Sequence, residues 1–313
     1  MSHREKSAAS PAPSDRRLAV LAMLAAVTIY GTNFAISRHA ILNGLTPLDL
    51  TALRFATAGL VLLPLFVRAG VSDCAGIGWG RGLILTLSSG VPMTLLMMTG
   101  LSMAPAAHGA SIGPGTVTTI GAVGGIVLFG VMPSRFAVAG ILTVLGGLAC
   151  IGIAAGISGS PTMLLGDLCF LGVGLLWGGY PLMLQLWKVD PLKATAVLSV
   201  LSAAVFMPYY VLAGHGANLS ATPLWLVVFH AFNQGILNMI IGLWLWGLAV
   251  AKIGAALSGR FPPLIPVIGT LSAIPLLGEW PAPLQWLGVS LIVGGLMLTT
   301  IKPAARQAAA TAP

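Results

Sequence analysis

Long apolar stretches with almost no charge follow one another along most of this chain of 313 residues. Charged residues make up only 7% of the sequence, whereas an ordinary soluble domain carries about 25%. Hydrophobic residues make up 57%, which is more apolar surface than a soluble fold of this size can hide. We therefore expect an all-α integral membrane protein whose main contacts are with membrane lipid.

The lengths of the apolar stretches predict how often the chain crosses the bilayer. A helix of about 20 residues crosses roughly 30 Å of hydrocarbon. Cutting the sequence at charges, prolines and polar clusters gives ten spans, expected at 18–37, 49–67, 82–102, 107–131, 136–156, 165–187, 195–213, 223–250, 254–277 and 283–301. Residues 1–17 are expected to form a disordered tail and residues 302–313 a second tail.

Positive charges fall almost entirely on one side of this arrangement. With the N-terminus inside, Arg38 alone falls on the outer side, and Arg54 and Arg260 fall within spans. The inner side holds Arg4, Lys6, Arg16, Arg17, Arg68, Arg81, Arg135, Lys188, Lys193, Lys252, Lys302 and Arg306. This bias is typical of loops kept in the cytoplasm, so both termini are expected there, with the bacterial inner membrane as the location. The net charge of +8 is thus assigned to topology, and no nucleic-acid partner is expected.

The chain also repeats itself. LAMLAAVTIYGTNFAI resembles LCFLGVGLLWGGYPLM, APAAHGASI resembles AVAKIGAAL, and GILTVLGG resembles GVSLIVGG, with a shared Pro-Leu pair at 47–48 and 191–192. The matches occur in the same order, which predicts a duplicated five-helix unit over 18–156 and 165–301. Because five is odd, the second copy enters the membrane from the opposite side, as in the inverted repeats of transporters.

Four motifs resemble those of the EamA-type branch of the drug/metabolite transporter superfamily. They are YGTNFAI at 30–36, LRF at 53–55, LLGEW at 276–280 and Gly-x-x-Leu-Ile-x-Gly-Gly at 288–295. The resemblance covers about 18–301, and it implies ten helices around a central cavity and export of amino acids or other small metabolites. The family often ends its fourth helix with a Gly-Glu pair, but residues 131–134 read VMPS here. Glu279 is therefore interpreted as a helix-end residue rather than a coupling site.

Helix breaks within the apolar runs point to a cavity. ALSGRFPPLIPVIG at 256–269 holds Arg260 and three prolines, and its counterpart in the first copy is the run Gly-Pro-Gly at 113–115. Proline removes a backbone donor, and the freed groups need partners in protein or water. Paired breaks predict a binding site, with a packing kink as the alternative. Arg260 either faces that cavity, where it would suit a carboxylate or phosphate, or reaches for lipid headgroups.

Polar and aromatic side chains within the spans are the other candidate substrate contacts. On the eighth span, His230, Gln234 and Asn238 recur at every fourth position and so share one helix face. The proposed contacts are Tyr30, Asn33, Ser88, His108, Ser111, Trp177, Tyr180, Asn233, Gln234, Asn238, Trp244 and Arg260. Interhelical hydrogen bonding and ordinary packing are the alternatives. A structural role is favoured for Arg54, and glycines such as Gly121 and Gly125 are expected to permit close helix packing.

Several kinds of chemistry are disfavoured. The chain has three cysteines without a CxxC motif, and it lacks the G-x-x-x-x-G-K-[ST] loop of ATPases. No metal, no cofactor and no enzymatic activity are therefore expected. The expected function is a monomeric secondary transporter that exports a small polar metabolite, an amino acid or a related anionic or zwitterionic solute, by alternating access. The alternatives are a lipid-linked carrier or flippase of the same fold and, less favoured, an intramembrane lipid-modifying enzyme.

Overall fold

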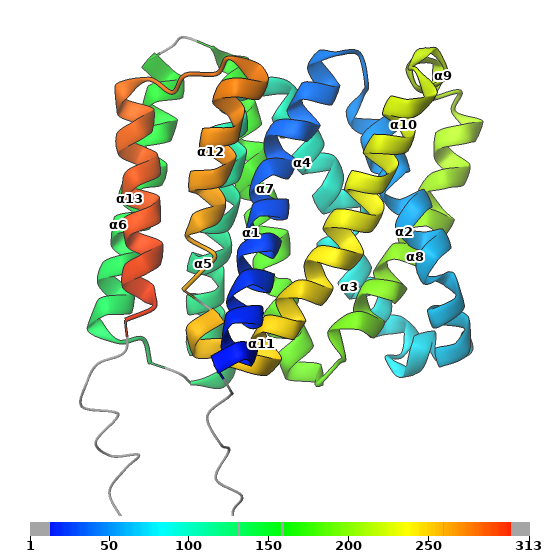
Figure 1. Cartoon of the computed structure of the whole chain (residues 1–313), viewed down its shortest axis with the longest axis horizontal. Coiled ribbons are helices and arrows are strands. Elements are labelled where there is room, and N and C mark those ends of the chain that lie inside the picture. The colour runs from blue at the N-terminus through cyan, green and yellow to red at the C-terminus, as the bar shows by residue number, and fades with distance from the viewer. Residues whose placement is uncertain (1–12, 131, 158–159, 259, 302–313) are drawn as a thin grey trace, which may run out of the picture.

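Helices standing side by side make up the architecture (Figure 1). A computed structural model describes residues 13–130, 132–157, 160–258 and 260–301, and those residues contain no strand. The helices are α1 (Pro13–Leu42), α2 (Pro47–Ala69), α3 (Trp79–Ser89), α4 (Val91–Met103), α5 (Ala106–Phe129), α6 (Arg135–Ile157), α7 (Pro161–Trp187), α8 (Pro191–Leu212), α9 (Ala217–Ala221), α10 (Leu224–Ala231), α11 (Gly242–Ser258), α12 (Leu264–Leu277) and α13 (Pro283–Thr299). A short 3₁₀ turn, η1 (Cys74–Gly76), follows α2, and a π-helix, η2 (Phe232–Ile241), joins α10 to α11.

Eight helical segments of the described chain are long and apolar enough to cross a membrane. The pair α3 and α4 forms one of them, and α10, η2 and α11 together form another. The remaining six are α1, α2, α5, α6, α7 and α8. Two shorter apolar helices, α12 and α13, stand beside them. The start of α1 and the end of α13 lie at the same end of the bundle, the lower edge of Figure 1.

Helix starts follow a repeated local signal in which a capping side chain precedes a proline. Proline suits the first helical position because its missing N–H would have no partner there. Thr46, Ser160 and Asp190 each accept a hydrogen bond from a backbone N–H three residues later, at 3.1, 3.3 and 2.9 Å, and each is followed by proline. These caps begin α2, α7 and α8.

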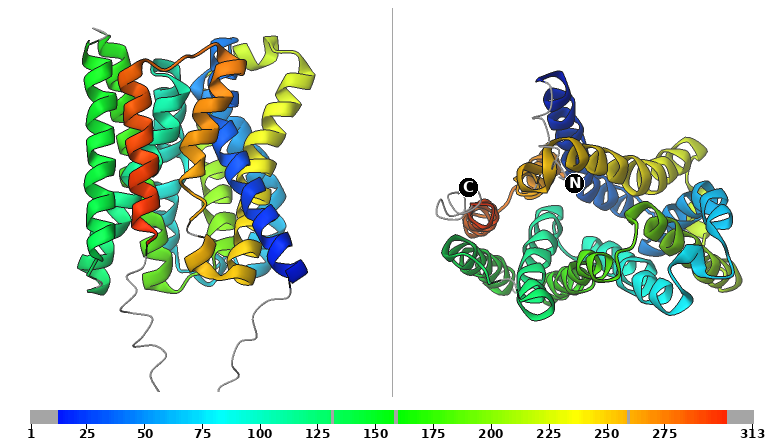
Figure 2. Two further views of the ribbon diagram at one scale, coloured as in Figure 1. Left: turned by 60° about the vertical axis from the view of Figure 1, so that its left-hand side comes forward. Right: turned by 90° about the horizontal axis from the view of Figure 1, so that it is seen from below.

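The helices pack as pairs around an elongated ring, which is visible when the bundle is seen from below (Figure 2). The main contacts join α2 with α8, α6 with α13, α5 with α7, and α1 with α12. Further contacts join α4 with α7 and α1 with α11. Helices distant in sequence are therefore neighbours throughout the bundle.

The pair α6 and α13 meets through glycines. A Cβ added at Gly147 would lie 2.6 Å from the carbonyl oxygen of Gly288, and one at Gly140 would lie 2.6 Å from that of Gly295. Both distances are too short for real atoms, so only glycine permits this approach. The close packing expected at Gly121 and Gly125 is wrong, because an added Cβ would meet nothing there within 4 Å.

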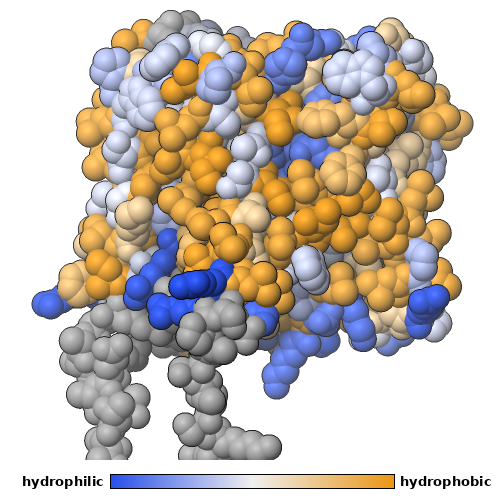
Figure 3. Space-filling view, in the orientation of Figure 1, coloured by the Kyte–Doolittle hydropathy of each residue, from blue (hydrophilic) through white to orange (hydrophobic). Residues whose placement is uncertain are grey.

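The outer surface is that of a protein surrounded by lipid. Apolar side chains cover the middle of the face shown in Figure 3, and hydrophilic residues gather along its lower edge. Large hydrophobic side chains such as Leu60, Val127 and Val205 are more than two-thirds exposed. Exposed apolar area of this extent marks an integral membrane protein.

The helix breaks differ from those expected. The break predicted at Gly113-Pro114-Gly115 is wrong, since α5 continues from Ala106 to Phe129. Its first turns are buried against neighbouring helices, and that packing outweighs the bond lost at one proline. In the second copy the adjacent Pro262 and Pro263 remove two donors, and the chain is not helical again until Leu264. The predicted link at 251–253 is also wrong, because α11 runs on to Ser258.

Two further helix boundaries differ from those expected. The first helix begins at Pro13, five residues before the expected Leu18, so only residues 1–12 of the predicted tail lie outside the described chain. The third expected span is divided at Gly90, which ends α3 and precedes α4. Val131 and Gly259, which belong to two of the stretches discussed above, also lie outside the described residues.

Candidate functional site

A cavity of about 70 Å³ lies inside the bundle, bounded by α1, α2, α4, α5, α7, η2 and α12. One part of its wall is apolar and is formed by Phe34, Met93, Met97, Phe170, Val173 and Ile265. Another part carries polar or aromatic groups from Tyr30, Asn33, Arg54, Trp177 and Asn238. Pro114 also lines this space, so the unbroken α5 still contributes to it. The lining therefore offers both polar and apolar contacts to a small solute that enters this space.

A second cavity, of about 120 Å³, adjoins the first. The two share Tyr30, Arg54, Met93, Trp177 and Asn238, and the second adds Ser89, Tyr180, Thr195, Leu198, Met239 and Leu243. Tyr180 lies towards the end of α7 and Thr195 near the start of α8. These two helices meet at the lower edge of Figure 1, where α1 begins. The combined space therefore extends towards that end of the bundle.

Buried amides join α1 to the π-helix beside the first cavity. Asn33 Oδ1 accepts hydrogen bonds from Asn233 Nδ2 at 3.1 Å and from Asn238 Nδ2 at 3.2 Å. Gln234 Nε2 donates to Ser37 Oγ at 2.7 Å. A π-helix is a rare element that is frequently found at functional sites. We call Asn33, Ser37, Asn233, Gln234 and Asn238 the amide network.

Arg54 brings a positive charge to both cavities. Its side chain is only 8% exposed, and it sits about 10 Å along α2 from Pro47. The guanidinium Nη1 donates to Gln234 Oε1 across a long 3.4 Å, and Nε has no hydrogen-bond partner among the described residues. No described carboxylate forms an ion pair with it. A buried charge is costly unless paired, so this cation is available to a bound anion.

The sequence favoured a structural role for Arg54. Asp49, five residues earlier on α2, does not pair with it: Asp49 accepts a hydrogen bond from the Tyr210 hydroxyl and bonds to Thr46 at the start of α2. The signal that could have identified Arg54 is the row of amides on the eighth predicted span. A helix that places Gln234 in a bundle interior needs a polar partner there.

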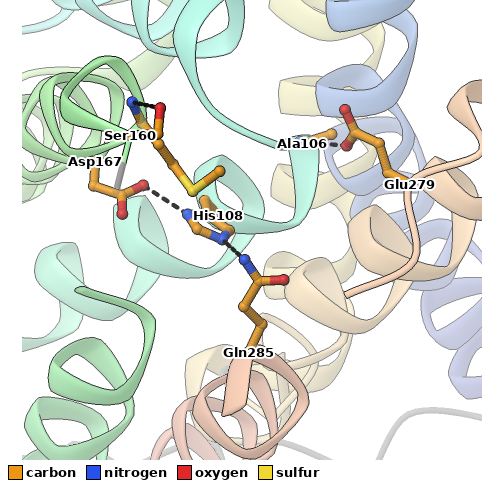
Figure 4. Close-up of polar contacts among 7 residues, drawn as sticks. Ala106, His108, Ser160, Asp167, Glu279 and Gln285 are labelled. Carbon is orange, nitrogen blue, oxygen red and sulfur yellow. Dashed lines mark hydrogen bonds and ion pairs between the residues drawn. The ribbon is translucent and has the colours of Figure 1, made fainter. Parts of the chain in front are cut away.

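A second set of polar side chains joins helices at the end of the bundle opposite the start of α1 (Figure 4). His108 Nδ1 lies 2.7 Å from Asp167 Oδ1, and His108 Nε2 lies 2.8 Å from Gln285 Nε2. Glu279 accepts a hydrogen bond from the Ala106 N–H at 2.9 Å and forms an ion pair with Arg38. We call Arg38, His108, Asp167, Glu279 and Gln285 the end cluster. It links α1, α5, α7 and α13 with the segment that follows α12.

The predicted contacts fall into four groups. Those that line a cavity or belong to the amide network are Tyr30, Asn33, Trp177, Tyr180, Asn233, Gln234 and Asn238. His108 belongs to the end cluster, while Ser88 and Ser111 are buried outside both cavities.

Trp244 and Arg260 lie on the surface instead. Trp244 is 63% exposed, and Arg260 is exposed beside the helix break that precedes α12. The exposed position of Arg260 fits the alternative in which it reaches for headgroups. That any of these residues contacts a substrate stays a prediction.

The two halves of the chain both match one known family. Residues 17–153 and residues 164–301 each match the EamA-like transporter family. The chain belongs to the EamA-like transporter family. Membership of this family points to a transporter rather than an enzyme, and the long apolar helices agree with a membrane protein.

Two individual proteins resemble this EamA-family chain. A probable terminal-alkyne amino-acid exporter from Streptantibioticus cattleyicolor is 35% identical over 79 residues. That match covers 25% of this chain and only 27% of the relative. A solved crystal structure aligns with a TM-score of 0.58 at 22% identity, covering 90% of this chain and 95% of that one. At this identity the structural similarity shows the fold alone.

Proposed function

We propose that this protein is a monomeric secondary transporter that exports a small polar metabolite, an amino acid or a related anionic or zwitterionic solute, by alternating access. The observation that carries the proposal is the internal cavity with the unpaired cation of Arg54. Helices from both family-matched segments bound that cavity. Ionisable groups inside membrane proteins typically mark substrate pathways.

Ten membrane crossings in two inverted five-helix repeats are part of this proposal. Eight long apolar segments and the shorter α12 and α13 supply ten helices. The chain enters and leaves the bundle at the same end, which requires an even number of crossings.

The helix pairing supports the inverted repeat. Exchanging the halves maps the contact of α5 with α7 onto that of α12 with α1, and the contact of α4 with α7 onto that of α11 with α1. It also maps the glycine contact Gly140–Gly295 onto Gly288–Gly147. Such a relation between halves is the usual basis of alternating access.

The cavities suggest which side the present conformation faces. The second cavity extends towards the end where α1 begins, while the end cluster joins helices at the opposite end. The former end carries the basic residues Arg68, Arg81, Arg135, Lys188 and Lys193 at the ends of α2, α3, α6, α7 and α8. By the positive-inside bias this end faces the cytoplasm of a bacterial inner membrane. The conformation is then inward-facing, ready to receive a solute for export.

The relative from S. cattleyicolor supports an amino-acid-like substrate, although it matches only a short stretch. Its name describes a probable exporter of terminal-alkyne amino acids. A cavity with one cationic group and an apolar wall fits that kind of solute.

Counterflow in proteoliposomes tests the proposal. Liposomes with the purified protein are loaded with a pool of unlabelled amino acids and small organic acids, and uptake of the labelled pool is followed. We expect saturable uptake that protein-free liposomes lack. Uptake no faster than in the empty liposomes would contradict a transporter of such solutes, and turnover of a lipid headgroup would favour an enzyme instead.

A further inference from the structure

We propose that Arg54 binds a carboxylate of the transported solute while the apolar wall of the same cavity takes the solute's hydrocarbon side chain. This inference rests on the proposed transport function and names its substrate class: small carboxylates that carry an apolar side chain. The amino group of an amino acid is then tolerated but not required.

The guanidinium of Arg54 has the donors and the position for this role. Its planar fork matches the two oxygens of a carboxylate, a geometry that the point charge of lysine does not reproduce. Nε lacks a partner, and the bond from Nη1 to Gln234 is long enough to be easily replaced. Arg54 lines both cavities, so an anion in either one can reach it.

Gln234 acts as a positioning residue for this guanidinium. Its Nε2 donates to Ser37 Oγ at 2.7 Å, and this bond orients the amide so that Oε1 points towards Arg54. Gln234 itself is fully buried and lines neither cavity. The amide network therefore holds the cation towards the cavity without competing for the solute.

The rest of the wall explains why the amino group is dispensable. No Asp or Glu is among the residues that line the two cavities. An ammonium group would find only neutral oxygens, such as those of Asn238, Ser89 and Thr195, and the aromatic faces of Tyr30 and Trp177, all of which are weaker partners than a carboxylate. The side chains of Met93, Met97 and Phe170 offer a flexible apolar surface for a short hydrocarbon chain. Recognition is therefore directed at the carboxylate and the apolar chain together.

Three probes of one shape test the assignment: 4-methylpentanoate, L-leucine and L-leucinamide. Binding to the purified full-length protein is measured by isothermal titration, and transport by counterflow of the labelled compounds. Both carboxylates are expected to bind, and leucinamide at least tenfold more weakly, because a charge-assisted hydrogen bond is lost. Arg54→Gln should weaken both carboxylates at least tenfold and remove their advantage over leucinamide, and Arg54→Lys should recover only part of it.

Arg68→Gln is the matched control, since it removes the same charge from the exposed end of the same helix. Size-exclusion profiles show which variants are folded. If Arg54→Gln does not fold, the comparison of leucine with leucinamide on the wild-type protein still tests the assignment. Equal binding of these two compounds would overturn it. Failure of all three probes would also overturn this substrate class. Pooled counterflow that persists in that case, or that is indifferent to Arg54→Gln, would leave the transport proposal standing without the anchor.

Discussion

Arg38, near the end of α1, forms an ion pair with Glu279, which directly follows the glycine that caps α12. The two residues are 241 positions apart and belong to the two different family-matched segments. Glu279 also accepts from the first N–H of α5, at Ala106, and Arg38 donates to the Leu101 carbonyl oxygen at 2.6 Å. One partly buried pair thus connects four helices at the end opposite the start of α1.

If the halves rock as proposed, this pair must separate when that end opens. Glu279→Gln keeps an acceptor for the Ala106 N–H but removes the ion pair. Loss of the ion pair would stabilise the open form relative to the closed form by about 1 kcal/mol, which raises the population of the open form roughly fivefold. A cysteine placed at Met93, which lines both cavities, should then react about fivefold faster with an impermeant maleimide added from the predicted outer side. The three native cysteines are replaced by alanine in all variants.

Asp73→Asn is the control, because it removes an exposed acid from the loop between α2 and α3. It should leave the labelling rate unchanged. A Glu279→Gln variant that labels no faster than its parent would show that the pair does not restrain opening of this end.

Glycine contacts between α6 and α13 lead to a stability prediction. In Gly147→Ala the new methyl group would lie 2.6 Å from the Gly288 carbonyl oxygen, so the two helices must move apart. Overpacking of this kind costs about 1–3 kcal/mol, and we expect a lower melting temperature in detergent by scanning calorimetry.

Gly146→Ala provides the neighbouring control, since an added methyl group meets nothing within 4 Å. Alanine also favours helix over glycine by about 1 kcal/mol, so the melting temperature should stay equal or rise slightly. Equal destabilisation by the two variants would contradict close glycine packing between these helices.

Much of the bundle could be predicted because membrane helices can be recognised from their apolar composition. Apolar runs of about 20 residues bounded by charges and prolines are local signals, and they indicated α2, α7 and α8 within a few residues. Helix breaks were harder to predict, because their cost depends on neighbours. The packing around α5 compensates for the hydrogen bond lost at Pro114, so that helix continues. Pro262 and Pro263 together interrupt the helix.

The candidate site was predictable in part for the same reason. Asn233, Gln234 and Asn238 stand out on an apolar helix, so their place in the interior follows from the sequence. The environment of a charged side chain, in contrast, does not follow from the sequence. Arg54 and Arg260 both lie within expected spans, but the fold buries the first beside Gln234 and leaves the second exposed. Only the tertiary packing separates a cavity cation from a surface one.

Asn33 should be the most sensitive member of the amide network. In Asn33→Leu the amides of Asn233 and Asn238 lose the oxygen that accepts from both. Interhelical hydrogen bonds in membranes contribute about 0.6–2 kcal/mol each, so a clear fall in melting temperature is expected. Thr32→Ala is the adjacent control, because the Thr32 hydroxyl bonds within its own helix, to the Thr28 carbonyl oxygen at 2.7 Å. Comparable losses in both variants would argue against a special role for Asn33.

Cys74 links stability to pH outside the membrane-spanning helices. It lies in η1, between α2 and α3, and its side chain is fully buried. Burial, followed by the nearby charge of Asp73, raises the pKa of the Cys74 thiol.

The folded protein therefore holds this proton more tightly than the unfolded chain, where the thiol ionises near its usual pKa of about 8.5. Stability from this group is complete below that pH and falls as the pH rises towards the folded-state pKa. We expect the melting temperature of the wild type to fall more steeply above pH 8 than that of Cys74→Ala, with a reductant present throughout. Parallel pH profiles for the two proteins would show that the buried thiol does not contribute.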